Sequence, residues 1–254
     1  VIHFAAFAYV GESTQNPALY YRNNTAGTLA LIESMMKSNV TKLVFSSTCS
    51  LYGNPVNIPI TENEPVKPIN PYASSKHMVE KFLADISAAS QLNYASLRYF
   101  NAAGAAPDGS MGESHDPEPH LIPLVLEAAE TGKPVKIFGD DYPTPDGTCI
   151  RDYIHIDDLA SAHIAALEYI SRKKESIIVN LGTGKGTSVR EIVSVCEKIM
   201  KKHVPVEVSA RREGDPAILV ADNSKATKVL GWNPQYGIEE IISHAYYWYK
   251  NKRY

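Results

Sequence analysis

Short buried strands and amphipathic helices alternate through the first half of the chain, and this alternation limits the possible folds more than any other feature. Apolar runs rich in β-branched and aromatic residues predict strands over residues 1–6, 42–47 and 94–100. Apolar residues at helical spacing predict helices over residues 17–39 and 71–90. Because strands that alternate with helices form βαβ units, we predict an α/β protein with a doubly wound parallel sheet.

The chain opens inside an apolar run, at Val1, with no methionine before it. This run lacks the basic leader, the cleavage pattern and the apolar length of a signal peptide. A buried strand of a parallel sheet needs neighbours on both sides. We therefore expect the natural protein to have strands upstream of Val1, so that the sheet of this chain lacks its first strands.

The second half, from about His120, has longer irregular connections and predicts a smaller C-terminal α/β lobe. Its predicted helices are residues 121–131, 157–171, 189–202, 224–230 and 238–250, and its predicted strands are residues 135–138, 149–155, 176–181 and 204–209. Segments 54–70 and 102–120, rich in proline or glycine, predict loops. We assign residues 1–101, with segments near 149–170, to the first domain and residues 102–254 mainly to the lobe.

Composition excludes several classes of protein. A formal net charge of −3 argues against a non-specific nucleic-acid binder, and no run approaches the ~18 apolar residues of a membrane span. Cys49, Cys149 and Cys196 are too few and too far apart for a disulfide framework or a zinc cluster, which favours a reducing cytoplasm. The eight histidines show no HxxxH or His/Cys ligand spacing, so we predict no metal site. We expect His3 and His155 to be structural.

A glycine-rich turn, Gly182–Gly186, lies between a predicted strand and a predicted helix, with Glu207 about twenty residues further on. This context is similar to a dinucleotide-binding fingerprint, but Thr187 stands where the third glycine is needed. We favour a turn that only starts a helix. A phosphate-binding turn at the helix N-terminus remains physically possible.

Tyr72 and Lys76 lie four residues apart on a predicted helix and so share one face. An ammonium beside a phenol favours the phenolate and lowers its pKa, which makes tyrosine a usable proton carrier. Ser46, Ser47 and Thr48 end a predicted strand, where the ligands of open parallel sheets bind. Tyr72, Lys76 and these hydroxyls would form an acid/base set for a substrate alcohol. Two other Tyr–Lys pairs have the same spacing, and the hydroxyls could equally cap a helix.

Five ordered motifs resemble the extended short-chain dehydrogenase/reductase superfamily and, within it, the UDP-glucose 4-epimerases. They are FSSTCSLYG (45–53), NPYASSK (70–76), RYFNAAGA (98–105), DYPTPDGTCIRDYIH (141–155) and RREGDPA (211–217). The resemblance covers the whole chain. It implies that residues 1–101 are the remainder of a Rossmann-like NAD-binding domain and that the C-terminal lobe binds a UDP-sugar.

The resemblance also implies an activity: NAD-dependent 4-epimerisation of a UDP-hexose through a 4-keto intermediate, with NAD held tightly between turnovers. It implies a homodimer built from the helices predicted at 17–39 and 71–90. A UDP-xylose/UDP-arabinose 4-epimerase would share every motif. The alternative from a different class is a non-catalytic UDP-sugar-binding fragment that lacks the cofactor phosphate site.

Roles for single residues follow from the same resemblance. Tyr72 would take the proton of the 4-hydroxyl, Lys76 would bind the nicotinamide ribose and lower the Tyr72 pKa, and Thr48 would bridge the sugar O4 and the phenol. The implied cofactor-binding residues are Phe4, Asn23, Ser46, Ser47, Tyr72, Lys76 and Tyr99. The implied substrate-binding residues are Thr48, Asn101, His120, Leu121, Phe138, Arg151, Tyr153, Arg212, Asp215 and Leu219.

Arg151 and Arg212 would grip the diphosphate with guanidinium forks, and a surface salt bridge is the alternative for each. The chain departs from the family pattern at three points. The glycine turn G-x-x-G-x-x-G and the acidic ribose contact are absent from this sequence, and the resemblance implies that they would precede Val1. Ala8 stands where some members have a cofactor-contacting lysine. Leu219 occupies the position that gates N-acetyl sugars, and its intermediate size leaves acceptance of UDP-GlcNAc open.

Overall fold

The structure is a computed structural model that describes residues 1–212 and 214–252, and the chain forms two compact units. Unit 1 comprises Val1–Tyr99, Ser161–Leu181 and Asn223–Trp232. Unit 2 comprises Phe100–Ala160, Gly182–Asp222 and Asn233–Tyr254. Among the described residues, no helix is long and apolar enough to cross a membrane.

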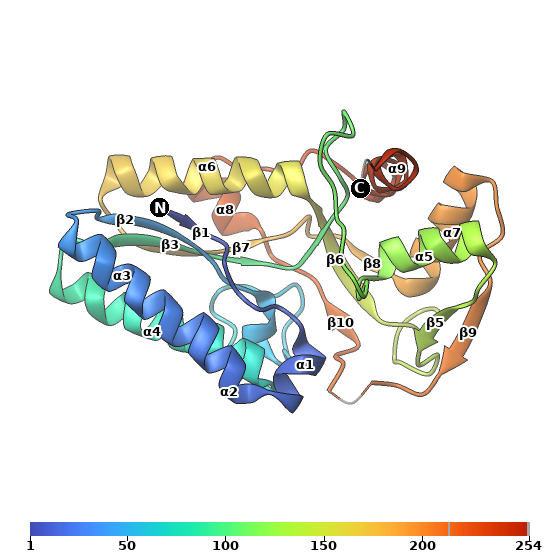
Figure 1. Cartoon of the computed structure of the whole chain (residues 1–254), viewed down its shortest axis with the longest axis horizontal. Coiled ribbons are helices and arrows are strands. Elements are labelled where there is room, and N and C mark those ends of the chain that lie inside the picture. The colour runs from blue at the N-terminus through green and yellow to red at the C-terminus, as the bar shows by residue number, and fades with distance from the viewer. Residues whose placement is uncertain (213, 253–254) are drawn as a thin grey trace. The chain divides into compact units, whose positions relative to one another are not determined.

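Unit 1 is built on a four-stranded sheet in the order β1-β2-β3-β7, in which every neighbouring pair is parallel (Figure 1). Its strands are β1 (Ile2–His3), β2 (Lys42–Ser46), β3 (Asn93–Tyr99) and β7 (Ile177–Leu181). Four of the five β2 residues are buried. Continuous burial of this kind is typical of parallel strands that are covered on both faces.

Helices cover both faces of this sheet. Figure 1 shows α3 and α4 below it and α6 and α8 above it, which confirms the predicted doubly wound arrangement. The helices of unit 1 are α1 (Val10–Gln15), α2 (Pro17–Tyr20), the π-helical segment η1 (Tyr21–Ala26), α3 (Gly27–Lys37), the 3₁₀ segment η2 (Cys49–Tyr52), α4 (Pro71–Ala89), α6 (Ile156–Lys173), which starts in unit 2, and α8 (Ser224–Leu230). Apolar side chains of α3, β2 and α4, among them Ile32, Phe45 and Leu83, form one buried core.

The start of α4 decides where the candidate site lies. Pro71 occupies the first turn, and the Asn70 side chain accepts a hydrogen bond from the Ala73 backbone N–H at 2.8 Å. A proline in the first turn and an Asn cap are both favoured at a helix N-terminus. The helix therefore begins one residue before Tyr72, so Tyr72 lies in its first turn.

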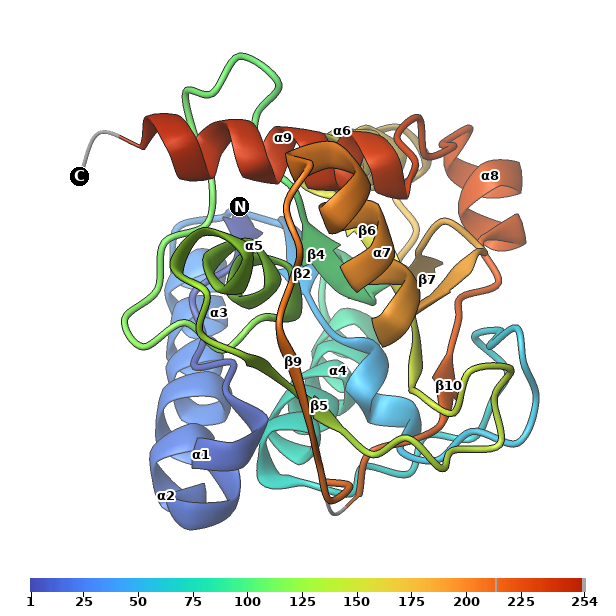
Figure 2. The same ribbon diagram turned by 90° about the vertical axis from the view of Figure 1, so that its right-hand side faces the viewer.

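Unit 2 contains a small sheet in the order β10-β6-β4, with β8 added to β6 in antiparallel fashion, and a separate parallel pair β5-β9. Its strands are β4 (Asn101–Ala103), β5 (Val135–Phe138), β6 (Ile150–His155), β8 (Gly186–Ser188), β9 (Val206–Ser209) and β10 (Ile218–Leu219). Helices α5 (Leu121–Thr131), α7 (Val189–Met200) and α9 (Ile238–Asn251) share one buried core (Figure 2). Ser188 and Glu191 form a capping box that starts α7.

The boundary between the units differs from the predicted division. Residues 149–160 belong to unit 2, because β6 pairs with β4, β8 and β10. Ser161–Leu181 and Asn223–Trp232 belong to unit 1, because β7 extends its sheet and α8 packs on β7. The predicted strand at residues 1–6 is shorter, Ile2–His3, and the predicted loop at 102–120 contains the end of β4.

Two histidines that the sequence marks as structural are both hydrogen-bonded within their own unit. The His3 ring meets the Thr28 hydroxyl at 2.9 Å. The His155 ring meets the His244 ring at 3.0 Å and lies stacked on Tyr236.

Candidate active site

Thr48 and Tyr72 lie close together in unit 1, as the motifs predict. Thr48 follows β2 and caps η2, where its hydroxyl oxygen accepts a hydrogen bond from the Ser50 N–H at 3.1 Å. The same hydroxyl lies near enough to the Tyr72 phenol to lower its pKa. Lys76 lies one helical turn further along α4. The structure thus gathers a hydroxyl, a phenol and an ammonium near the carboxyl end of a parallel strand, where open α/β sheets bind their ligands.

Lys76 is almost completely buried, with 3% of its surface exposed. Its ammonium donates to the Ser46 carbonyl at 2.8 Å and lies 4.9 Å from the centroid of the Phe45 ring. Burial lowers the pKa of Lys76 to about 8. An ammonium has three N–H donors, and within the described residues one of them has an acceptor. The others suit the oxygen of a ligand hydroxyl, such as that of a ribose.

Burial has the opposite effect on the phenol, because it disfavours a negative charge. It raises the pKa of Tyr72 above its usual value; Tyr99 raises it further, and the nearby Thr48 hydroxyl lowers it. The sequence-based expectation of a lowered Tyr72 pKa is therefore wrong in direction. The physical reason is that Lys76 is itself desolvated and directs its ammonium at the Ser46 carbonyl.

A buried polar network lies behind this set, and the sequence reasoning missed it. Glu80, one turn beyond Lys76 on α4, forms an ion pair with Arg98 of β3 at 2.5 Å, and both side chains are at least 94% buried. The same carboxylate accepts a hydrogen bond from the Ser47 hydroxyl at 2.7 Å. Arg98 also donates to the Tyr52 hydroxyl at 2.9 Å. Glu80 therefore connects α4, β3 and the residue that precedes Thr48. In the sequence, Glu80 is marked only by its position four residues after Lys76.

The other predicted cofactor residues differ in exposure. Phe4 follows β1, is 58% exposed and has its ring 4.7 Å from that of His163. Asn23 is exposed on η1, and its amide donates to the neighbouring Asn24 at 3.0 Å. The Ser46 hydroxyl, by contrast, pairs with the Tyr99 hydroxyl inside the protein. Phe4 and Asn23 can therefore contact a ligand directly, whereas Ser46 holds neighbouring groups in place.

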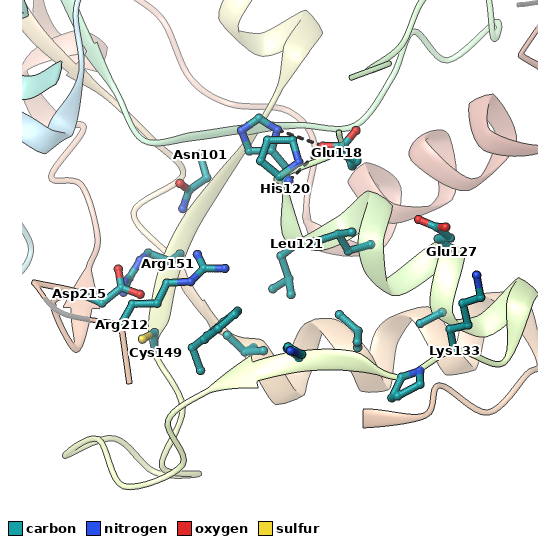
Figure 3. A pocket seen from close by; sticks show the side chains of 18 of the residues that line it. Asn101, Glu118, His120, Leu121, Glu127, Lys133, Cys149, Arg151, Arg212 and Asp215 are labelled. Carbon is teal, nitrogen blue, oxygen red and sulfur yellow. Dashed lines mark hydrogen bonds and ion pairs between the residues drawn. The ribbon is translucent and has the colours of Figure 1, made fainter. Parts of the chain in front are cut away.

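Unit 2 contains a cavity of about 660 Å³ (Figure 3). A cavity of this size accommodates a drug-sized or nucleotide-sized ligand. Seven of the predicted substrate residues line it: Asn101, His120, Leu121, Phe138, Arg151, Arg212 and Asp215. Tyr153 instead belongs to the buried core of unit 2. Leu219 pairs with Arg151 across β10 and β6 and lies outside the lining.

Figure 3 shows two arginines, Arg151 and Arg212, beside Asp215 on one side of the cavity. Arg151 forms a salt bridge with Asp215 at 3.2 Å and donates to the Ile150 carbonyl at 2.9 Å. The Arg212 guanidinium lies 3.8 Å from the centroid of the Phe138 ring. Guanidinium groups match phosphate geometry, and an aromatic ring can stack on a base. Arg151 therefore forms a salt bridge with Asp215 and also lines the cavity, where it can contact a ligand.

The glycine-rich turn has a partner within the protein. The buried Asp152 carboxylate accepts hydrogen bonds from the backbone N–H groups of Thr183 at 2.8 Å, Gly184 at 3.0 Å and Ala221 at 3.1 Å. A Cβ at Gly182 would lie 2.5 Å from that carboxylate. These amides are thus committed to Asp152, and the turn leads through β8 into α7, as the simpler interpretation proposes.

Comparison with known proteins adds independent information. The NAD dependent epimerase/dehydratase family matches residues 1–182. The UDP-glucose 4-epimerase of Halalkalibacterium halodurans is 50% identical over 252 residues, which cover 98% of this chain and 75% of the relative. The crystal structure of UDP-glucose 4-epimerase from Brucella ovis in complex with NAD is 49% identical and has a TM-score of 0.94, with 98% of this chain and 77% of that chain covered.

A third comparison concerns both ligands. The crystal structure of UDP-glucose 4-epimerase from Bifidobacterium longum in complex with NAD⁺ and UDP is 43% identical, with a TM-score of 0.93 over 98% of this chain and 76% of that chain. Half of the residues are thus shared with the first relative over nearly the whole chain, and the fold is shared with solved members. The chain therefore belongs to the NAD dependent epimerase/dehydratase family, and within it to the UDP-glucose 4-epimerases.

Proposed function

We propose that this protein interconverts UDP-glucose and UDP-galactose by NAD-dependent epimerisation at C4, through a 4-keto intermediate. The observation that carries the proposal is that the Thr48 hydroxyl lies near the Tyr72 phenol, with Lys76 on the next turn of the helix, in a chain about half identical to UDP-glucose 4-epimerases. A hydroxyl and a phenol close together are the groups needed to move one proton on and off a sugar hydroxyl.

Unit 1 supplies the groups that fit NAD. The partly unpaired Lys76 ammonium would bind the hydroxyls of the nicotinamide ribose, and the exposed Phe4 and Asn23 are further contacts. When bound, NAD⁺ would supply the acceptor and the donor for the C4 hydride. The positive charge of the oxidised nicotinamide also favours the phenolate, which burial alone disfavours.

Tyr72 then moves the proton. As the C4 hydrogen leaves as hydride, the Tyr72 phenolate takes the proton of the 4-hydroxyl, and the C4–O bond becomes a carbonyl. Thr48, which lies near the phenol, orients the substrate hydroxyl and relays the proton. In the second half-reaction Tyr72 returns the proton to the oxygen, while C4 regains its hydrogen on the opposite face. Atoms and electrons balance over the cycle.

Unit 2 supplies the groups for the uridine diphosphate. Arg151 and Arg212 neutralise the two phosphates, Asn101 adds a neutral hydrogen-bonding group, and Phe138 offers an aromatic face. Leu121 and the His120 ring lie on the opposite wall. Binding free energy is thus concentrated on the nucleotide. The hexose must be held loosely, because it has to present both faces of C4.

Replacement of Tyr72 by phenylalanine tests the proposal. Tyr72→Phe removes the proton carrier but keeps the ring, so we expect UDP-galactose turnover to fall by about 10²–10⁴-fold or more. Calorimetric UDP binding should not change, because the nucleotide contacts lie in unit 2. Tyr169→Phe is the matched control, since Tyr169 also precedes a lysine by four residues but lies late in α6, partly exposed and hydrogen-bonded to Glu175. Normal turnover in Tyr72→Phe would refute the role of this residue.

The cofactor is tested separately. Purified protein that is denatured and filtered should release NAD, detected by enzymatic cycling or by absorbance after reduction. Protein that binds UDP but neither carries nor accepts NAD would favour the UDP-sugar-binding alternative. A cytoplasmic location agrees with three buried cysteines that form no disulfide.

We also propose that two copies associate through α3 and α4. Leu29 and Met36 on α3 and Met78 on α4 are 38–45% exposed, although all three side chains are apolar. Apolar side chains that gather on one surface favour protein–protein contacts. Light scattering should give the mass of a dimer, and Met36→Lys combined with Met78→Lys should give a monomer. A wild-type protein that is monomeric at micromolar concentration would contradict this arrangement.

A further inference from the structure

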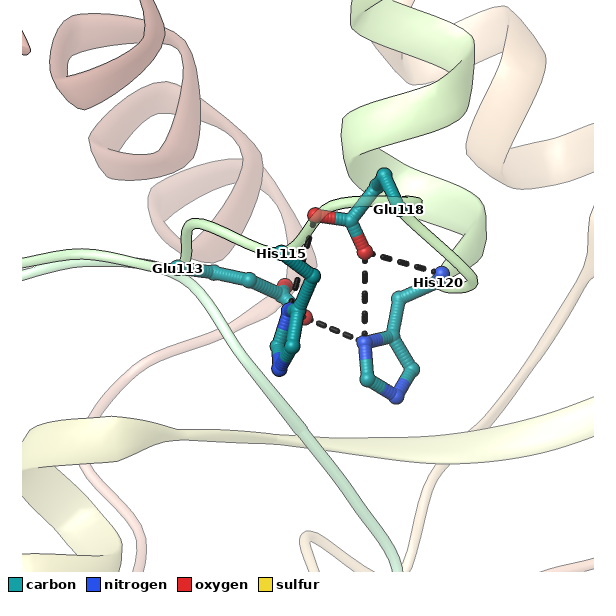
Figure 4. A group of neighbouring side chains, drawn as sticks. All are labelled: Glu113, His115, Glu118 and His120. Carbon is teal, nitrogen blue, oxygen red and sulfur yellow. Dashed lines mark hydrogen bonds and ion pairs between the residues drawn. The ribbon is translucent and has the colours of Figure 1, made fainter. Parts of the chain in front are cut away.

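The loop before α5 brings together four side chains that can ligate a metal: Glu113, His115, Glu118 and His120 (Figure 4). One ligand atom from each lies within 4.8 Å of the ligand atoms of the other three. Figure 4 shows both imidazole Nδ1 atoms turned toward the two carboxylates. The spacing E-x-H-x-x-E-x-H contains no HxxxH or His/Cys pair, so the sequence alone does not indicate this group.

Three of the four His–Glu separations are close to those expected around one small ion, and the fourth, between His120 and Glu113, is a direct hydrogen bond. The His115 Nδ1 atom lies 3.1 Å from Glu113 and 3.6 Å from Glu118, and the His120 Nδ1 atom lies 3.4 Å from Glu118 and in contact with Glu113. Zinc bonds of 2.0–2.2 Å in a tetrahedron place neighbouring ligand atoms about 3.3–3.5 Å apart. An ordinary ion pair joins one imidazole to one carboxylate, whereas here each imidazole faces both carboxylates.

Neighbouring contacts hold the loop in this shape. The Trp248 indole N–H donates to the Glu113 carbonyl at 2.8 Å. Gly112 lies so close to the same indole that a Cβ there would be 2.3 Å from the ring. The His120 backbone N–H donates to the Glu118 carboxylate at 3.0 Å. The two carboxylates are largely covered, with side-chain exposures of 20% and 16%. The ligand set is therefore preorganised from the backbone.

We propose that Glu113, His115, Glu118 and His120 form a structural site for one Zn²⁺ ion. Two imidazole nitrogens disfavour Ca²⁺ and Mg²⁺, which prefer oxygen-only sites, and two nitrogens with two carboxylate oxygens suit a borderline divalent ion. Four protein ligands complete a tetrahedron and leave no position for substrate, so the ion has no catalytic role. With neutral imidazoles, the two carboxylates balance its double charge.

The site has a consequence for the neighbouring cavity. His120 precedes α5 and also lines the 660 Å³ cavity, together with Leu121. An ion held by His120 Nδ1 would fix the start of α5, and with it this wall of the cavity. The inference rests on the four ligands alone and does not depend on the proposed epimerase activity.

Metal binding by tag-free protein tests the proposal directly. After removal of metals with a chelator, we titrate Zn²⁺ against a chromophoric zinc indicator and expect one tight site per chain. Co²⁺ in place of Zn²⁺ should give the visible absorption of a tetrahedral site. Saturating Zn²⁺ should also raise the melting temperature, because it binds only the folded state.

Two variants locate the site. His115→Ala removes a ligand that does not line the 660 Å³ cavity, and we expect at least a tenfold loss of Zn²⁺ affinity. Glu113→Gln changes one atom and keeps the backbone contact with Trp248, so it serves if His115→Ala folds poorly. The control is His203→Ala, which removes an exposed histidine that pairs with Glu197 at 2.7 Å. It should bind Zn²⁺ like the wild type.

Several outcomes would overturn the inference. Absence of a stoichiometric site would mean that the four side chains form only an ion-pair cluster. Unchanged affinity in both His115→Ala and Glu113→Gln would place any bound zinc elsewhere, for example on a thiol, since all variants keep the three buried cysteines. Equal loss of affinity in His203→Ala would show that the loss is not specific to this loop.

Discussion

The charged side chains near Tyr72 in unit 1 and those that line the cavity of unit 2 differ in exposure. In unit 1, Lys76, Glu80 and Arg98 are 3–5% exposed and hydrogen-bonded to the backbone or to one another. In unit 2, the Arg151 side chain is 14% exposed and that of His120 is 54% exposed, both beside an open cavity. Buried charges are oriented and weakly screened, which suits the transfer of one proton. Accessible charges can still capture an anionic ligand from water.

Loss of the buried ion pair should have the largest effect. Glu80→Ala leaves the Arg98 guanidinium buried without its carboxylate, so we expect the free energy of unfolding to fall by about 3–5 kcal/mol. Urea denaturation measures this loss of unfolding free energy. Glu239→Ala breaks an exposed pair with Lys198 and should change stability by only a small fraction of that amount. Equal losses in the two variants would erase the contrast between buried and exposed charges.

Loss of an accessible arginine should affect ligand binding more than folding. Arg151→Ala removes one guanidinium from the cavity, and we expect UDP binding to weaken by about 1.5–3 kcal/mol, with stability little changed. Calorimetry measures the affinity. Arg190→Ala, on the exposed surface of α7 and outside the cavity lining, is the control. UDP affinity that survives in Arg151→Ala would mean that unit 2 binds the nucleotide by other groups.

The buried lysine should produce a smaller, pH-dependent effect. Its pKa is about 8 in the folded protein and has the ordinary value of 10.5 when unfolded. Between pH 8 and 10 the unfolded chain therefore binds more protons than the folded one, so the free energy of unfolding rises with pH. We expect Lys76→Met to abolish a rise on the order of 1–2 kcal/mol. Lys198→Met, at an exposed position, should keep it.

The opposite result is equally informative. A Lys76→Met protein whose stability changes with pH as in the wild type would show that Lys76 does not titrate in this range. Contacts other than the hydrogen bond to the Ser46 carbonyl would then have to stabilise the buried Lys76 ammonium. The difference between buried and accessible charges would then rest, in unit 1, on the Glu80–Arg98 pair.

Much of the fold was predictable from local pattern. The bounds of α5, β5 and α8 agree with the predictions, because each element has clear periodicity and a glycine or a charged turn at its end. The short strands β4, β8 and β10 were not predicted. Two or three residues are too few to show a period of two, and their pairing partners lie far away in the sequence.

The residues of the candidate site also form two groups, those that the sequence indicates and those that it does not. The motif residues Tyr72, Thr48 and Arg151 could be identified in advance, because each lies within a run of recognisable residues. The Glu80–Arg98 pair and the Glu113–His120 cluster could not be identified. The first pair joins α4 to β3, and the second depends on how a loop of irregular backbone folds back beside α9.

The amino-acid sequence by itself determined the alternation of strands and helices, the start of α4 at Pro71 and the types of residue available for chemistry. These properties depend on contacts between near neighbours in the chain, which local pattern records. Only the tertiary structure decided which charges are buried, which way the Tyr72 pKa shifts and which four side chains share one point before α5. The burial of a charged group and the meeting of four side chains depend on segments that are distant in the sequence, so local sequence patterns do not predict them.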